Sequence, residues 1–172
     1  STAQILGNNE SFEPISSNMF VRRTLSGEFI VINKYLMNIL HQLDLWNEEM
    51  KYKIMYHKGS IQNIKEIPSF IRDMYKTVWE IKKKTLIDMM ADRGAYVDQS
   101  ASFNLYAEEC TPELLTKCHL HSFNRGLKTG CYYIRSRPAC DSQSFTIDPS
   151  LEKKFKQELL EKEKEVFEMC SA

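Results

Sequence analysis

The sequence predicts an α/β protein in which short strands alternate with longer helices. Brief apolar runs typical of strands are separated by segments whose apolar residues recur every three or four positions, the spacing of one helix face. Strands separated by helices usually pair in parallel through helical crossovers. Because only a few strands are present, an open sheet of this size would expose its edges, and we expect the sheet to be incomplete by itself.

Residues 1–59 are expected to form a short helix, two strands and two further helices. The first helix, at residues 1–7, can begin at a capping hydroxyl and stop at the glycine. Residues 18–25 and 28–32 are extended, and the Ser-Gly pair between them forms a turn. Apolar residues at helical spacing then predict one helix through Tyr35, Leu36, Ile39, Leu40 and Leu43, and a second, ending at Gly59, through Met50, Ile54 and Met55.

The longest helical region is expected to begin at Pro68 and to end at Arg93, because Gly94 is a good helix stop. The next element is a short strand at residues 102–106. The apolar stripe of the long helix comprises Val78, Ile81, Leu86, Met89 and Met90, and its solvated side carries Lys82, Lys83 and Lys84.

The clearest helix start in the chain is Thr111-Pro112-Glu113. It combines a capping hydroxyl, a proline at the first helical position and an acid in the first turn. This helix is expected to run to about Arg125, where Gly126 ends it. Residues 132–135 form the next strand, and a charged helix with a loose apolar stripe starts at Leu151.

Composition restricts the classes of function. The chain has 172 residues, enough for one domain with a sizeable core. Its 23 basic and 23 acidic residues give a formal charge of zero, so there is no electrostatic case for a nucleic-acid partner. No apolar run approaches the roughly 20 residues that span a bilayer, and the start of the chain does not resemble a signal peptide. We therefore expect a soluble, cytoplasmic protein without a membrane partner.

The cysteines and histidines predict neither a disulfide framework nor a metal site. The five cysteines form no Cys-x-x-Cys pair, and an odd count at irregular spacing fits a reducing compartment. Cys131 and Cys140 are expected to be small packing residues near the last strand. His119 and His121 are two apart, a spacing that points their rings apart on a helix.

The most informative residues are the consecutive tyrosines Tyr132 and Tyr133. A phenol keeps its proton at neutral pH, but if the proton leaves with an electron the group can carry a radical, and two phenols in contact can relay it. Ordinary packing is the alternative, since tyrosine favours half-buried strand positions. Successive strand residues point to opposite faces, so a relay needs a strand end or a distortion, which Gly130 and Pro138 permit.

Several strings in the chain together resemble the large subunit of class I ribonucleotide reductase, the enzyme that makes deoxynucleotides. They are STAQILGNNE at 1–10, RRTLSGEF at 22–29, LWNEEM at 45–50, YKTVWEI at 75–81, DRGAYVDQS at 92–100 and GLKTGCYYIRSRP at 126–138. The likeness runs from Ser1 to about Thr146. It implies that residues 1–148 are the C-terminal part of a ten-stranded α/β barrel, helix-rich with few parallel strands, and that residues 149–172 are a charged helical or flexible tail.

The resemblance implies roles for particular residues. Tyr132 would lie beside the active-site thiol and Tyr133 nearer the small subunit, so that the pair transfers a radical inward. The tail of the small subunit would dock between the helices at residues 75–93 and 112–125, a usual way to capture a peptide, although core packing also explains their apolar stripes. The substrate-phosphate loop would end with Ser1, Thr2 and Ala3; free N–H groups and hydroxyls at a helix start bind anions, and simple helix capping is the alternative.

The resemblance also assigns partners and cofactors. The partners would be the reductase small subunit, a ribonucleoside diphosphate and, in the full-length protein, a second large subunit. No cofactor is implied for this segment: the radical-generating metal centre belongs to the small subunit, and nucleotide effectors bind the N-terminal part. Cys170 matches one cysteine of the family's redox tail but Phe167 replaces the other, so exchange with thioredoxin or glutaredoxin lacks a complete pair.

Two functions follow as hypotheses. The chain can be the C-terminal segment of a ribonucleoside-diphosphate reductase large subunit that contributes radical transfer, part of the phosphate site and small-subunit docking. Because the family's active-site cysteines lie upstream of the matched strings, the isolated segment is then expected to be inactive. The alternative is a truncated, non-catalytic module that binds the reductase small subunit.

Overall fold

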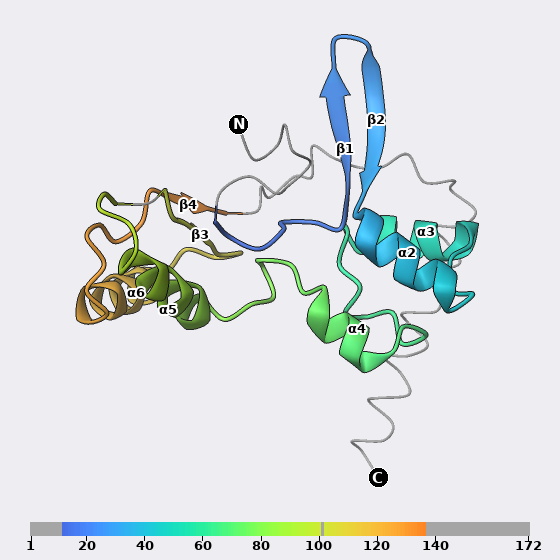
Figure 1. Cartoon of the computed structure of the whole chain (residues 1–172). Helices are drawn as coiled ribbons and strands as arrows, with labels where there is room; N and C mark the ends of the chain where they lie inside the picture. The colour runs from blue at the N-terminus through green and yellow to red at the C-terminus, as the bar shows by residue number, and fades with distance from the viewer. Residues whose placement is uncertain (1–11, 101, 137–172) are drawn as a thin grey trace. The chain divides into compact units, whose positions relative to one another are not determined.

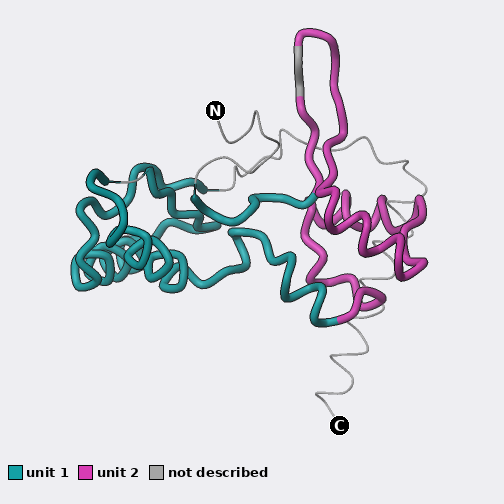
Figure 2. Tube along the Cα trace, viewed as in Figure 1, with its two compact units in different colours: residues 1–18, 69–140 teal, residues 19–68, 141–172 magenta. Residues whose placement is uncertain are grey.

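Figure 1 shows the computed structural model of the chain, which describes residues 12–100 and 102–136. The helices expected at residues 1–7 and from Leu151 onward lie outside the described residues. The chain divides into two compact units, one of residues 1–18 and 69–140 and the other of residues 19–68 and 141–172 (Figure 2). No helix in the described part is long and apolar enough to cross a membrane.

The unit that contains residues 19–68 begins with a hairpin. Strand β1 (Met19–Thr24) pairs antiparallel with β2 (Gly27–Ile32), which confirms the two predicted strands and the turn between them. Helices α2 (Lys34–Gln42) and α3 (Glu48–Tyr56) follow, as predicted. The buried apolar residues of this unit include Met19, Leu36, Leu40, Met50, Ile54, Ile61, Ile64 and Ile67.

Asparagine side chains start both helices of this unit. The Asn33 side chain accepts hydrogen bonds from the backbone N–H groups of Tyr35 and Leu36, and that of Asn47 accepts one from Met50 at 2.7 Å. Each bond satisfies a donor that the first turn of a helix leaves without a partner inside the helix. Helix α3 stops at Tyr56, and the Gly59 N–H then donates to the Ile54 carbonyl, so the predicted glycine closes the end of the helix.

The other unit holds helices α4 (Ser69–Met74), α5 (Lys83–Gly94) and α6 (Pro112–Asn124), with strands β3 (Asn104–Tyr106) and β4 (Tyr133–Arg135). Strands β3 and β4 pair in parallel and α6 makes the crossover between them, which confirms the α/β pattern in this part of the chain. Among the described residues each sheet has two strands, so they form no closed barrel.

Helix α6 follows the prediction closely. The Thr111 hydroxyl accepts a hydrogen bond from the Leu114 N–H, Pro112 opens the helix and Asn124 is its last residue. Gly126 then adopts φ +74°, a conformation that costs glycine little and that side chains rarely adopt. The start and the stop of the crossover helix are therefore encoded locally.

The single long helix predicted from Pro68 to Arg93 is wrong. The structure has α4 and α5, with residues 75–82 between them. Long-range hydrogen bonds explain the break: the Val78 N–H donates to the Ile15 carbonyl at 2.9 Å, and the Asn18 side-chain amide donates to the Tyr75 carbonyl at 3.0 Å. These backbone groups are thereby taken from the ladder that a continuous helix needs.

The break also changes which residues face the core. Helix α5 buries Leu86, Ile87 and Met90, whereas Met89, predicted in the apolar stripe, is 36% exposed. One buried cluster of this unit joins α5, β3 and α6. Its buried members are Val78, Leu86, Ile87, Met90, Phe103, Leu105, Tyr106 and Cys118.

Candidate functional site

The two predicted relay tyrosines lie in contact. The ring centroids of Tyr132 and Tyr133 are 4.3 Å apart with an interplanar angle of 63°. Strand β4 begins at Tyr133, so Tyr132 stands just before the strand and escapes the alternation that would send the two rings to opposite faces. The sequence-based condition for contact, a strand end, is met.

Strand β3 holds the backbone on both sides of this pair. The Tyr132 N–H donates to the Phe103 carbonyl at 2.6 Å, and the Ala107 N–H donates to the Arg135 carbonyl at 2.9 Å. Between these bonds, Asn104 stands opposite Tyr133 in the parallel register. The position of the tyrosines is therefore fixed by main-chain pairing.

The loop before the tyrosines passes tightly beside α6. A Cβ atom added at Gly130 would lie 2.8 Å from Nδ1 of His119, closer than real side chains approach. Glycine is the residue that allows this passage. Next to it, Cys131 packs against the core cluster, as predicted, and burial raises the pKa of its thiol.

Both rings are open to solvent within the described part of the chain. Tyr132 is 64% exposed and Tyr133 is 53% exposed, so neither fills the core cluster, and ordinary core packing does not explain them there. The Arg135 guanidinium lies 5.7 Å from the centroid of the Tyr133 ring, within cation–π range. A hydrogen bond with Tyr133 raises the pKa of Tyr132, so this phenol keeps its proton to a higher pH than an ordinary tyrosine does.

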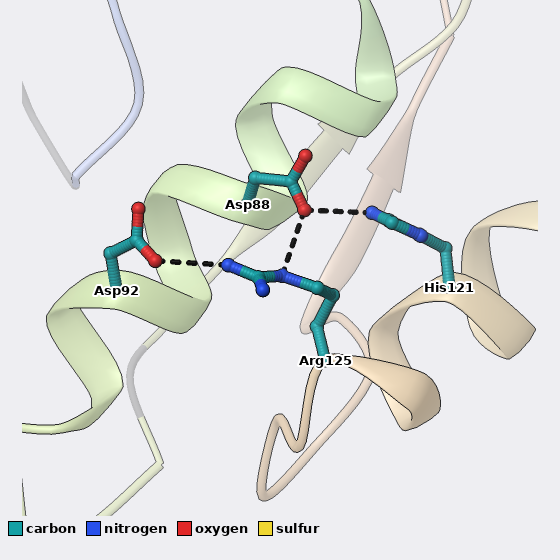
Figure 3. Close-up of polar contacts among 4 residues, drawn as sticks. All are labelled: Asp88, Asp92, His121 and Arg125. Carbon is teal, nitrogen blue, oxygen red and sulfur yellow. Dashed lines mark hydrogen bonds and ion pairs between the residues drawn. The ribbon is translucent and has the colours of Figure 1, made fainter.

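The segments predicted to form a docking site, residues 75–93 and 112–125, contain helices α5 and α6, and these two helices pack together in the same unit; residues 75–82 of the first segment are not helical. A charged network crosses between them (Figure 3). The Asp88 carboxylate accepts from Nε2 of His121 at 2.8 Å and from Nε of Arg125 at 2.9 Å, and Asp92 pairs with Nη2 of Arg125 at 2.9 Å. These contacts cross-link successive turns of the two helices.

Apolar side chains are also exposed on these helices. Leu120 is 58% exposed and Phe123 is 80% exposed, both on α6, and Met89 is the partly exposed residue of α5. Residues of this size at the surface are the kind that a peptide partner buries.

The remaining predicted site residues have different outcomes. His119 lies against Gly130, whereas His121 pairs with Asp88, so the two rings have different neighbours. The phosphate-loop residues Ser1, Thr2 and Ala3 and the cysteines Cys140 and Cys170 lie outside the described residues, so the predictions for them stay predictions.

Sequence reasoning missed two features of this region. The charged network had a signal: Asp88 and Asp92 are four apart, as are His121 and Arg125, and each pair lies on one helix face. This spacing could not show that these two helix faces lie against each other. The other missed residue is Glu13, a buried side chain whose Oε1 accepts from the Asn104 N–H at 2.5 Å; it is 91 residues away in sequence and had no local signal.

Comparisons with known proteins agree on one family. Residues 1–133 match the family described as "Ribonucleotide reductase, barrel domain". The "Ribonucleoside-diphosphate reductase large subunit" of Trypanosoma brucei brucei is 57% identical over 149 residues, which are 87% of this chain and 18% of that protein. The protein of the same name from Arabidopsis thaliana is 49% identical over 168 residues, 98% of this chain and 20% of that protein. The chain thus spans about a fifth of the length of these relatives.

A solved structure gives the same answer for the fold. The "Actinobacillus ureae class Id ribonucleotide reductase alpha subunit" matches with a TM-score of 0.69 and 30% sequence identity, over 81% of this chain and 25% of that chain. Together with the barrel-domain match, this supports the predicted α/β class.

The Tyr133→Phe variant should lower the pKa of Tyr132 toward the ordinary tyrosine value of about 10, because the hydroxyl that stabilises the protonated phenol is removed. The measurement is a pH titration of ring-labelled tyrosine by NMR, with the Tyr132 signal assigned from Tyr132→Phe. Tyr96→Phe is the matched control, since Tyr96 is 91% exposed and belongs to no ring pair among the described residues. An unchanged Tyr132 titration in Tyr133→Phe would contradict the hydrogen bond.

The Asp88→Asn variant should lose stability at neutral pH and little at low pH. The hydrogen bond from His121, aided by the charges of His121, Arg125 and Lys84, holds the pKa of Asp88 below its ordinary value. A carboxyl of this kind stabilises the fold above about pH 4, and the contribution is lost as pH falls through the folded-state pKa.

The check is the free energy of unfolding of both proteins between about pH 7 and pH 2, in steps across the aspartate range. Asp98→Asn is the control, because Asp98 is exposed in the same unit and its carboxyl enters none of the ion pairs among the described residues. If the difference in unfolding free energy between wild type and Asp88→Asn stays constant with pH, the ionised carboxyl of Asp88 is not its cause.

Proposed function

Because this chain belongs to the ribonucleotide reductase large-subunit family, we propose that it is the C-terminal part of a ribonucleoside-diphosphate reductase large subunit and carries that subunit's radical relay. The observation that carries the proposal is the contact between Tyr132 and Tyr133, at 4.3 Å between ring centroids. The enzyme in which it acts is an oxidoreductase that converts ribonucleotides to deoxyribonucleotides.

The relay step is a hydrogen-atom transfer between two phenols. When Tyr133 is a phenoxyl radical, the O–H bond of Tyr132 breaks and an O–H bond forms on Tyr133, so one electron and one proton move together. Tyr132 is left as the radical and Tyr133 as the phenol, and no charge is created. The hydrogen bond between the two side chains gives the proton a short path, and the raised pKa of Tyr132 keeps that proton on the phenol until transfer.

Helices α5 and α6 are the proposed docking surface for the C-terminal tail of the reductase small subunit. The two helices are held together by the Asp88, His121 and Arg125 contacts and present Leu120 and Phe123 to solvent. An extended or helical peptide gains affinity by burying such side chains. Because α6 is also the crossover between β3 and β4, the proposed docking surface and the tyrosines are joined by one helix and one loop.

Ser1, Thr2 and Ala3 are proposed as the end of the substrate-phosphate loop, and Cys170 as the remaining cysteine of the redox tail. Support for the first is chemical, because hydroxyls and free N–H groups at a helix start suit a diphosphate. The second is weakened by Phe167, which occupies the position of the partner cysteine.

A non-catalytic module that binds the small subunit is the second candidate. Its supporting observations are the exposed apolar residues of α6 and the incomplete cysteine pair of the tail. The two candidates share the docking surface and differ in the relay. Substitution of the tyrosines therefore separates them.

In the full-length large subunit that carries this segment, Tyr132→Phe and Tyr133→Phe should each abolish deoxynucleotide formation, because phenylalanine has no O–H bond to donate. Turnover is measured with the small subunit and a dithiol, and substrate binding is measured separately and should be retained. Tyr96→Phe, an exposed tyrosine outside the pair, should keep wild-type turnover. Turnover near wild type in Tyr132→Phe or Tyr133→Phe would disprove the radical relay and favour the binding module.

A peptide that carries the C-terminal tail sequence of the small subunit should bind this chain. Phe123→Ala should weaken the binding at least about tenfold, or about 1.4 kcal/mol, since the largest exposed apolar group of α6 is lost. Fluorescence titration of the labelled peptide gives both affinities. Phe70→Ala is the matched control, because Phe70 is 62% exposed on α4, outside the proposed surface. Undetectable binding at about millimolar peptide, a free energy weaker than about 4 kcal/mol, would count against both candidates.

A further inference from the structure

We propose that Glu13 is a positioning residue for the tyrosine pair: its carboxyl group fixes the peptide group of β3 that holds Tyr132 in contact with Tyr133. The importance of this contact for radical transfer rests on the proposed function. The placement itself rests on hydrogen bonds, burial and strand register in the structure.

Glu13 is an unusual side chain for its surroundings. It is 6% exposed, and its Oε1 accepts from the Asn104 N–H at 2.5 Å. Burying a carboxyl group is costly unless it is hydrogen-bonded, and bonds that involve an ionisable acceptor are among the stronger ones. The residue is therefore anchored to the start of β3 through this contact.

The peptide group that Glu13 contacts is the one that holds Tyr132. In a trans peptide the C=O of one residue and the N–H of the next point in opposite directions. The N–H of Asn104 points to Glu13, and the carbonyl of Phe103, in the same peptide group, accepts from the Tyr132 N–H at 2.6 Å. A carboxyl, one peptide group and the Tyr132 N–H thus form a continuous row of hydrogen bonds, in which each bond polarises the next.

The residue whose N–H bonds Glu13 also stands next to the partner tyrosine in the sheet. Asn104 stands opposite Tyr133 in the β3–β4 register. A shift of this peptide group would move the backbone of Tyr132 relative to that of Tyr133, because Tyr132 stands before the strand and Tyr133 is its first residue. Glu13 consequently acts on the separation of the rings through this peptide group.

Glu13 itself is held in place from both sides. The Phe12 carbonyl accepts from Nη1 of Arg93 at 3.0 Å, and the Ile15 carbonyl accepts from the Val78 N–H at 2.9 Å. These bonds tie the backbone around Glu13 to the end of α5 and to the segment before it. Because the backbone of Glu13 is held by these other bonds, its carboxyl group can restrain the position of β3.

Three variants of the 172-residue chain test this inference through the Tyr132 titration. Glu13→Ala removes the acceptor, so the ring contact should loosen and the pKa of Tyr132 should fall toward the ordinary value of about 10. Glu13→Gln keeps an acceptor oxygen and should restore the wild-type titration. Asn47→Ala is the control, since Oδ1 of Asn47 also accepts a backbone N–H, that of Met50 at 2.7 Å, but belongs to the other unit.

The inference is overturned if Glu13→Ala leaves the Tyr132 titration unchanged, or if Asn47→Ala shifts it equally. If Glu13→Ala does not fold, Glu13→Asp takes its place: it keeps the carboxyl group and withdraws the acceptor by one methylene. A lowered Tyr132 pKa in Glu13→Asp supports the inference, and an unchanged one overturns it.

This titration and the turnover assay fail independently. If Tyr132→Phe and Tyr133→Phe keep turnover while Glu13→Ala shifts the pKa of Tyr132, the radical relay is disproved and the positioning role of Glu13 stands. Loss of turnover in the phenylalanine variants with a titration indifferent to Glu13 would do the opposite.

Discussion

The parallel pairing of β3 with β4 is the constraint on which the candidate site depends. It is only three residues long on each strand, yet it determines where Tyr132 and Tyr133 stand. Two short strands cannot hold a register by their own hydrogen bonds, and the structure supports them from outside. Leu105 and Tyr106 lie in the core cluster, Ile134 packs against it, and the crossover helix α6 brings the second strand back alongside the first.

Much of the fold was readable from the sequence because its signals are local. The hairpin and helices α2, α3 and α6 were predicted from turn residues, caps and apolar spacing. The helix predicted across residues 75–82 failed for the opposite reason: Val78 and Tyr75 give their backbone groups to residues about 60 positions away. Spacing within a segment carries no information about such partners, and the loss of Met89 from the predicted core follows from the same error.

The candidate site divides in the same way. The tyrosines were found from their own string, and the need for a strand end followed from the alternation of side chains along a strand. Glu13 and the Asp88 network were missed, because each depends on which elements face one another. The chain spans about a fifth of the length of its curated relatives, and among the described residues the sheet of the site has two strands. The edge of β3 that faces away from β4 is occupied, since Glu13 accepts the N–H of its first residue.

The cross-link between α5 and α6 gives the two halves of the site different sensitivities to dissolved salt. Asp88, Asp92 and Arg125 are partly or largely exposed, and mobile ions screen such pairs over a distance of about 8 Å at physiological ionic strength. Main-chain bonds between β3 and β4 involve no net charge and are screened far less. Concentrated salt should therefore weaken the ion pairs between α5 and α6, while the apolar packing of these helices and the spacing of the phenol rings persist.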